Sequence, residues 1–131
     1  MAIITEDYVS FETAKLLKEK GFNVKCDKCY AYFADDDIRF LNLKYPKLAQ
    51  LLIENRYPCI TLQMAMKWLR EVHNIVIVID VCRETGREGF YCWQLEDNRT
   101  GDWIDNIVGE CPTYEEACEA AIKYYLEKFI K

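Results

Sequence analysis

Two cysteines, Cys26 and Cys29, have the spacing of half a structural zinc site. A complete site needs two more ligands, but the sequence has no second C-x₂-C or C-x₂-H pair, so only folding could bring in Cys59 or Cys111. A redox dithiol would open a helix after a strand, whereas this pair precedes the β-forming residues 30–33. We therefore interpret both cysteines as packing residues and predict no metal and no cofactor, with a zinc site as the weaker alternative.

His73 is the only histidine, and it falls at the end of a predicted helix, where a cation would complement the helix dipole. A Cys–His nucleophilic pair would have to use it, and the sequence indicates no cysteine beside it. The acidic run Asp35–Asp37 lacks the spaced ligands, the glycine and the closing glutamate of a calcium loop. Phosphate-binding, nucleophile-elbow and metalloprotease motifs are also missing. These observations favour a non-enzymatic protein.

Three aromatic residues, Tyr91, Trp93 and Trp103, could lie on one face of a predicted sheet. If helices cover that face, it belongs to the core. If the face stays open, it becomes a surface for a ligand or a partner. The core is favoured, and the open face is kept as the candidate binding site.

Length and composition limit the class of protein. With 131 residues we expect one domain, spanning residues 1–131, with a buried core. Hydrophobic residues make up 51% and charged residues 30%, which is typical of a globular chain. No apolar run approaches the ~20 residues of a membrane span, and the first residues lack the pattern of a signal peptide. We expect a cytoplasmic protein.

The seven cysteines are an odd number, which does not suit a secreted disulfide framework. Cys118 falls in a predicted helix stripe, and Cys82 and Cys92 flank one turn as possible cross-strand neighbours. We expect reduced thiols that serve mainly in packing.

The 17 basic and 22 acidic residues give a net charge of −5. Binding to nucleic acid depends on Lys and Arg residues that neutralise phosphates, and the sequence has no basic cluster. We expect neither nucleic acid nor a membrane as a partner, unless folding gathers a local basic patch.

Residues 61–131 carry the clearest structural pattern, a helix followed by three strands and a closing helix. Thr61 caps the first helix, and Thr113 with Glu116 forms a capping box for the last one. The apolar stripe of the closing helix consists of Tyr114, Ala117, Cys118, Ala121, Ile122, Tyr125, Leu126 and Phe129. The stripe of the first helix consists of Leu62, Ala65, Met66, Leu69 and Val72, with Trp68 at its margin. The strands are expected over residues 75–83, 90–96 and 103–108.

Double-stranded-RNA-binding domains have this same order of elements. They bind phosphates through lysines at the start of their last helix, where this chain has Glu115, Glu116 and Glu119. The similarity of order therefore concerns the fold and not the function.

The first half is less clear. Ser10 caps a predicted helix from Phe11 to Lys20, and Gly21 and Phe22 end it. Extended structure is expected over residues 23–33, an edge strand near residues 3–4, and a helix over residues 46–54. We predict an α+β fold, with an antiparallel sheet of three or more strands packed against helices.

Three segments carry a resemblance to a known family: residues 6–22, residues 61–71 and Thr-Tyr-Glu-Glu-Ala at 113–117. They resemble the opening, central and closing segments of a family of small uncharacterised proteins from gut bacterial phages, prophages and mobile elements. The resemblance supports the fold and implies a bacterial setting, but no activity.

The sequence thus leaves three functions open. The leading hypothesis is a non-enzymatic accessory protein that binds another protein or forms a homo-oligomer. The alternative is a small-molecule-binding domain that uses the aromatic sheet face, and the third is an enzyme of unknown class.

Overall fold

The described part of the chain comprises residues 6–24, 28–34, 37–42, 56–83, 86, 88–104 and 108–130 of a computed structural model. Its elements, in chain order, are α1 (Phe11–Glu19), β1 (Lys28–Ala34), β2 (Asp37–Asn42), β3 (Arg56–Pro58), α3 (Leu62–His73), β4 (Ile75–Val81), β5 (Tyr91–Asp97), β6 (Gly109–Cys111) and α4 (Tyr114–Lys128).

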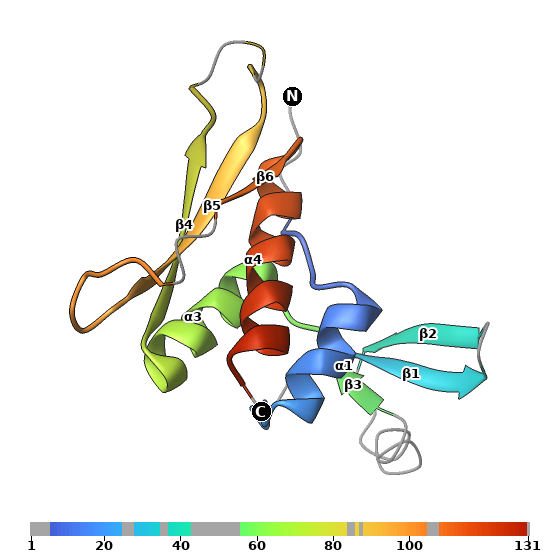
Figure 1. Ribbon diagram of the computed structural model, residues 1–131. Coiled ribbons are helices and arrows are strands. Elements are labelled where there is room, and N and C mark those ends of the chain that lie inside the picture. Colours follow the sequence, from blue (N-terminus) through green and yellow to red (C-terminus); the bar gives the residue numbers. More distant parts are fainter. Residues whose placement is uncertain are drawn as a thin grey trace.

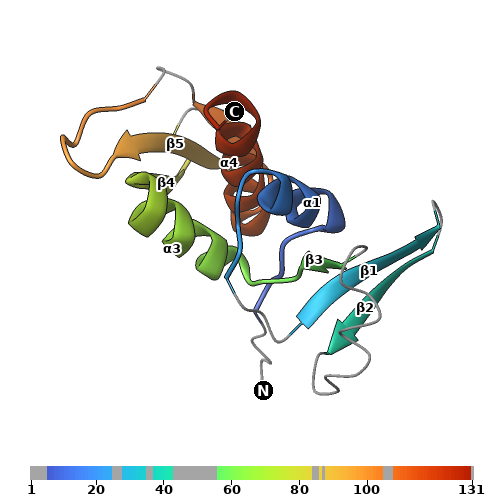
Figure 2. The same ribbon diagram turned by 90° about the horizontal axis from the view of Figure 1, so that it is seen from below.

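Two antiparallel sheets of three strands lie on either side of the helices, in the orders β2-β1-β3 and β4-β5-β6 (Figures 1 and 2). The predicted α+β fold class is therefore confirmed, as is the order of helix, three strands and helix in the second half. Within the described residues, no helix has the length and apolar character needed to cross a membrane.

Helix α1 begins and ends at the predicted signals. The Ser10 hydroxyl accepts a hydrogen bond from the Thr13 backbone N–H at 3.3 Å. At the other end, Gly21 adopts a φ of +100°, and the Phe22 N–H donates to the Leu17 carbonyl at 2.9 Å. Because glycine adopts positive φ without a steric penalty, this residue ends the helix and turns Phe22 back onto it.

Helix α3 also has the predicted cap, with the Thr61 hydroxyl accepting from the Met64 N–H at 3.1 Å. Its buried face differs from the prediction. Trp68, expected at the margin, is only 7% exposed, whereas Val72, expected in the stripe, is 56% exposed. The face is rotated toward Trp68 because Phe22 packs edge-on against that indole, with ring centroids 5.2 Å apart.

Helix α4 crosses the inner face of the β4-β5-β6 sheet. Thr113 caps it by accepting from the Glu116 N–H at 3.1 Å. Its buried residues are Ala117, Cys118, Ala121, Ile122, Tyr125 and Leu126, all from the predicted stripe. The first and last residues of that stripe, Tyr114 and Phe129, are exposed.

The third strand of the second half lies later in the chain than expected. Trp103 makes only an isolated bridge to Glu96, and β6 begins at Gly109. The turn after β5 brings the chain back at Trp103, with Gly101 at a φ of +79°. Strand pairing with β5 resumes where Gly109 lies opposite Trp93.

The sheet of the first half was predicted only in part. Strand β1 falls in the segment expected to be extended, but β2 and β3, which pair with its two sides, were not predicted. The edge strand expected near residues 3–4 and the helix expected over residues 46–54 lie outside the described residues.

The core joins the two ends of the chain. Buried side chains of α1, α3 and α4 pack together and against β4 and β5. Glu119 of α4 connects α4 to α1: its Oε1 accepts from the Ser10 backbone N–H at 3.0 Å, from the Ser10 hydroxyl at 2.6 Å and from the fully buried Thr13 hydroxyl. We call these three residues the α1–α4 clamp.

Candidate functional site

The three aromatic residues singled out in the sequence do not share one face. Trp93 is 6% exposed and packs against Tyr124, with ring centroids 5.3 Å apart. Tyr91 lies on the same inner face and contacts Tyr114 edge-on, with ring centroids 6.0 Å apart. Trp103 is 50% exposed and is bridged to Glu96, so it belongs to the opposite face, since directly paired residues share a face.

Of the two cysteines with zinc spacing, Cys26 lies outside the described residues, and Cys29 is buried on β1 as a free thiol. Burial raises the pKa of the Cys29 thiol, with a further contribution from Cys59 that Arg56 opposes. Burial therefore favours the neutral thiol at Cys29 over the thiolate form.

A different cysteine pair is brought together. Cys82 and Cys92 are joined as a disulfide across β4 and β5, with Cα atoms 5.7 Å apart. Their predicted cross-strand proximity is confirmed, but the expectation of free thiols is wrong for this pair. The described free cysteines are Cys29, Cys59, Cys111 and Cys118.

His73 is the last residue of α3, as expected, but its ring lies among aromatic side chains. The imidazole centroid is 4.8 Å from the Trp68 ring and 5.9 Å from the Tyr125 ring. Burial lowers the pKa of His73 below its ordinary value of 6.5. The folded protein therefore favours the neutral imidazole, and not the cation that the helix end alone would suggest.

This environment predicts a loss of stability in mild acid. The unfolded state binds a proton at His73 below about pH 6.5, whereas the folded state resists protonation until lower pH. The free energy of unfolding, measured by urea denaturation, should therefore fall as the pH is lowered from 7.5 through 6.5 to 5.5. His73→Phe keeps an aromatic ring there and should show a flatter profile. Equal slopes for the two proteins would contradict this account.

The most distinctive surface feature is the edge of strand β4 that faces away from β5. The Cys82 N–H donates to Phe90 and the Asn98 N–H to Asn74, so even-numbered residues of β4 form the hydrogen-bonded pairs with β5. The backbone N–H and C=O groups of Ile75, Ile77 and Ile79 therefore point away from β5. No strand among the described residues pairs with this side. We call this side of the strand the β4 edge.

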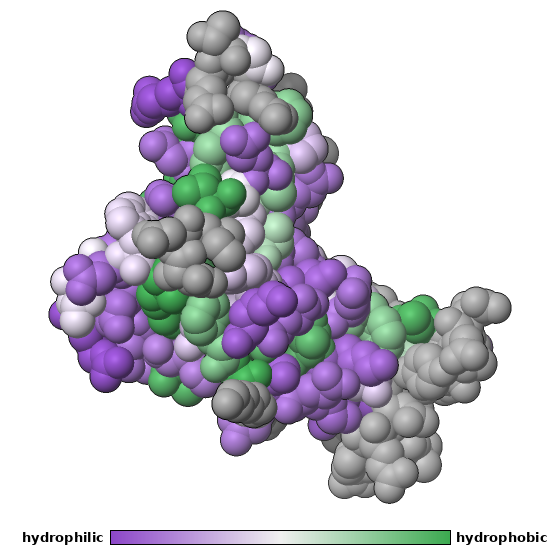
Figure 3. All heavy atoms as spheres, in the orientation of Figure 1, coloured by the Kyte–Doolittle hydropathy of each residue, from purple (hydrophilic) through white to green (hydrophobic). Residues whose placement is uncertain are grey.

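The other sheet edges of the described part carry features that discourage strand addition. Strand β6 has three residues, and β3 has three residues ending in Pro58. Strand β2 contains Asp37 and Arg39 and pairs with β1 through a bulge. By contrast, β4 is seven residues long and has a single charged residue, Asp80. In Figure 3 the arm formed by β4 and β5 carries green and pale-green patches among purple, hydrophilic surface.

Sequence reasoning identified β4 as a strand but not as an edge. The available signal was the run from Ile75 to Ile79, which contains only Ile and Val and no lysine or proline. That signal becomes informative only when the strand order places β4 at the end of its sheet.

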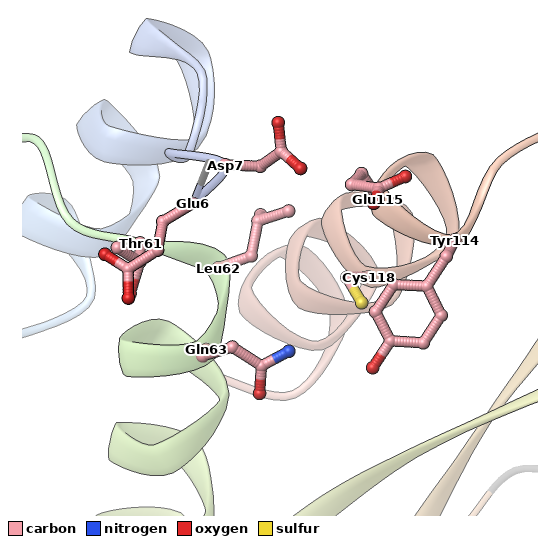
Figure 4. A pocket seen from close by; sticks show the side chains of 8 residues that line it. All are labelled: Glu6, Asp7, Thr61, Leu62, Gln63, Tyr114, Glu115 and Cys118. Atoms are coloured by element: carbon pink, nitrogen blue, oxygen red, sulfur yellow. The ribbon is translucent and has the colours of Figure 1, made fainter. Parts of the chain in front are cut away.

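A pocket of about 210 Å³ lies between the starts of α3 and α4 (Figure 4). Its lining residues are Glu6, Asp7, Thr61, Leu62, Gln63, Tyr114, Glu115 and Cys118. Burial raises the pKa of the Cys118 thiol to about 11, so this cysteine remains a thiol and not a nucleophilic thiolate. The three carboxylates give the pocket a negative charge, which disfavours phosphates and nucleic acid.

Comparisons with known proteins found no matching family model, no matching curated protein and no matching solved structure.

Proposed function

We propose that this chain is a non-enzymatic accessory protein that acts through protein–protein contact, and that the β4 edge is its contact surface. The partner we propose is a second copy of the chain, giving a homodimer. The observation that carries this is the set of outward-pointing backbone N–H and C=O groups of Ile75, Ile77 and Ile79, on a strand whose side chains are mostly apolar. The resemblance to small phage and mobile-element proteins supports a bacterial setting and implies no activity, so the accessory role rests on the β4 edge.

The β4 sequence suits antiparallel pairing with itself. Pairing centred on Val78 places Ile77 opposite Ile79, so the outward backbone groups of the two copies exchange hydrogen bonds. The same register places Asp80 opposite Val76, which avoids a contact between like charges. Two three-stranded sheets would thereby become one continuous sheet with a two-fold axis, the usual symmetry of a homodimer.

The overall charge works against this association. Each copy carries a net charge of −5, so the two copies repel each other at low ionic strength. Salt screens repulsion between exposed charges, with a Debye length of about 10 Å at 0.1 M. Dimerisation should therefore strengthen as salt is raised, whereas an interface held by ion pairs would weaken.

We expect Val78→Lys to convert the dimer into a monomer. Val78 lies on the outer face of β4, away from the core, and a lysine there would face its own symmetry copy across the interface. Size-exclusion chromatography with light scattering would measure the mass. The matched control is Gln94→Lys, which adds the same charge on the same face but on the central strand β5, directly opposite Val78. It should remain a dimer.

A wild-type monomer at high protein concentration and 0.3–0.5 M salt would overturn the homodimer, as would a dimer that Val78→Lys leaves intact. Small-molecule binding at the aromatic sheet face remains the alternative. The buried position of Trp93 gives it no support, but a monomer carrying a bound mass in a native mass spectrum would favour it.

A further inference from the structure

Three potential metal ligands meet on the outer face of the β4-β5-β6 sheet. Glu110 lies directly opposite Cys92 in the β5–β6 ladder, and Cys82, the residue after β4, is joined to Cys92. The two sulfur atoms and a carboxylate oxygen of Glu110 all lie within 4.8 Å of one another. Among the described residues, this is the one group of three such ligands.

The chemistry of this set fits zinc. Two thiolates and a carboxylate are ligand types that Zn²⁺ accepts in tetrahedral sites, and softer sulfur ligands select it over Mg²⁺ and Ca²⁺. Three protein ligands leave the fourth position for water. Cys92 and Glu110 stand on β5 and β6, and Cys82 directly follows β4 with its N–H bonded to the Phe90 carbonyl, so hydrogen-bonded backbone holds their relative positions.

We propose that Cys82, Cys92 and Glu110 form a redox-controlled zinc site, closed as a disulfide when oxidised and able to bind Zn²⁺ when reduced. This inference does not depend on the β4 edge or on dimer formation.

The redox step is an ordinary thiol–disulfide exchange. A dithiol reductant gives two electrons and two protons to the Cys82–Cys92 bond and becomes a disulfide itself, leaving two cysteine thiols. Zinc then displaces the thiol protons, so binding should weaken as the pH falls. A reducing compartment such as the cytosol keeps such thiols reduced and would favour the metal-bound form.

Some neighbouring charges favour cation binding at this site and others oppose it. Asp80 lies directly opposite Cys92, adding a second carboxylate on this face. Its Oδ1 accepts from the Val81 N–H at 2.8 Å and lies 3.8 Å from an Arg83 nitrogen. The arginine offsets part of the negative charge, so the affinity for a cation must come mainly from the three ligands themselves.

The test compares the reduced and oxidised full-length chain. Protein reduced with a phosphine, which does not compete strongly for zinc, and protein with the disulfide intact are titrated with Zn²⁺ by calorimetry. Native mass spectra count the bound ions. We expect one zinc per chain in the reduced protein and none at this site in the oxidised one. Co²⁺ should give the near-ultraviolet thiolate-to-cobalt absorption band.

The variants assign the ligands. Cys92→Ser and Cys82→Ser should each abolish the tight binding. Even loss of an outer-shell partner costs about 10–100-fold in metal affinity, so Glu110→Gln should weaken binding by at least roughly tenfold. The matched control is Cys111→Ser, next to Glu110 on β6, which removes a thiol outside the group and should bind as wild type. Circular dichroism checks that each variant is folded.

Three results would overturn the proposal. They are no zinc binding by the reduced protein at micromolar concentrations, binding that survives in both serine variants, and equal binding by the oxidised form. The second result would place the metal at other cysteines of the chain.

Discussion

Gly109→Ala should destabilise the protein by about 3 kcal/mol, because overpacking a filled core has costs of this size. A methyl group built on Gly109 would overlap the Trp93 indole. That indole is itself buried between the sheet and α4, where Tyr124 packs against it. Neither the ring nor the strand can move away without disturbing the core. Single domains are stable by only about 5–15 kcal/mol, so this loss is large.

Urea denaturation followed by tryptophan fluorescence measures the effect. Val108→Ala, at the exposed residue just before β6, is the control and should stay within about 0.5 kcal/mol of wild type. A second comparison tests the mechanism. Trp93→Phe makes room for the methyl group, so Gly109→Ala should cost less in that background than alone. Equal costs in the two backgrounds would show that the clash is not the cause.

Glu119→Ala should cost about 2 kcal/mol, the second largest effect we expect. It removes the acceptor of the α1–α4 clamp and leaves the fully buried Thr13 hydroxyl without its carboxylate partner. An unsatisfied buried polar group costs about 1–3 kcal/mol, and the contact left to Thr13 Oγ1 is a long one, 3.3 Å to Ser10 Oγ. The Ser10 N–H and hydroxyl lose the same acceptor but lie where water can replace it.

A double-mutant cycle separates the clamp from simple charge removal. Thr13→Val keeps the shape of the side chain and removes the hydroxyl, so Glu119→Ala should cost less in that background. Glu127→Ala removes the same charge from an exposed position of α4 and should stay within about 0.5 kcal/mol of wild type. Additive costs for Thr13→Val and Glu119→Ala would show that the two residues are not coupled.

The elements that could be predicted are those specified by neighbouring residues. Ser10, Thr61 and Thr113 each accept from a backbone N–H three residues later, so a short window of sequence is enough to locate these helix starts. The alternation of Ile and Val in β4 is local in the same way. Strand β3 gave no such signal, because three residues ending in Pro58 show no periodicity.

Features that depend on distant contacts could not be predicted. Whether Trp68 or Val72 lies in the core is decided by Phe22, which belongs to another part of the chain. Glu119 looked like one more exposed acid on the polar face of a helix, and its role depends on residues 106 and 109 positions away. Predicting the β4 edge would have required the strand order. Predicting the group of Cys82, Cys92 and Glu110 would have required the strand pairing of this sheet.

The α1–α4 clamp joins two helices that the ribosome makes at different times. Thr13 is translated 106 residues before Glu119, and at roughly 5–20 residues per second this interval lasts about 5–20 s. During that time α1 can form, because its caps are local, but the helix against which it packs has not yet been made. The first helix can therefore contact β3 early, through Phe11 and Tyr57, whereas its contacts with α4 form only once α4 has been made.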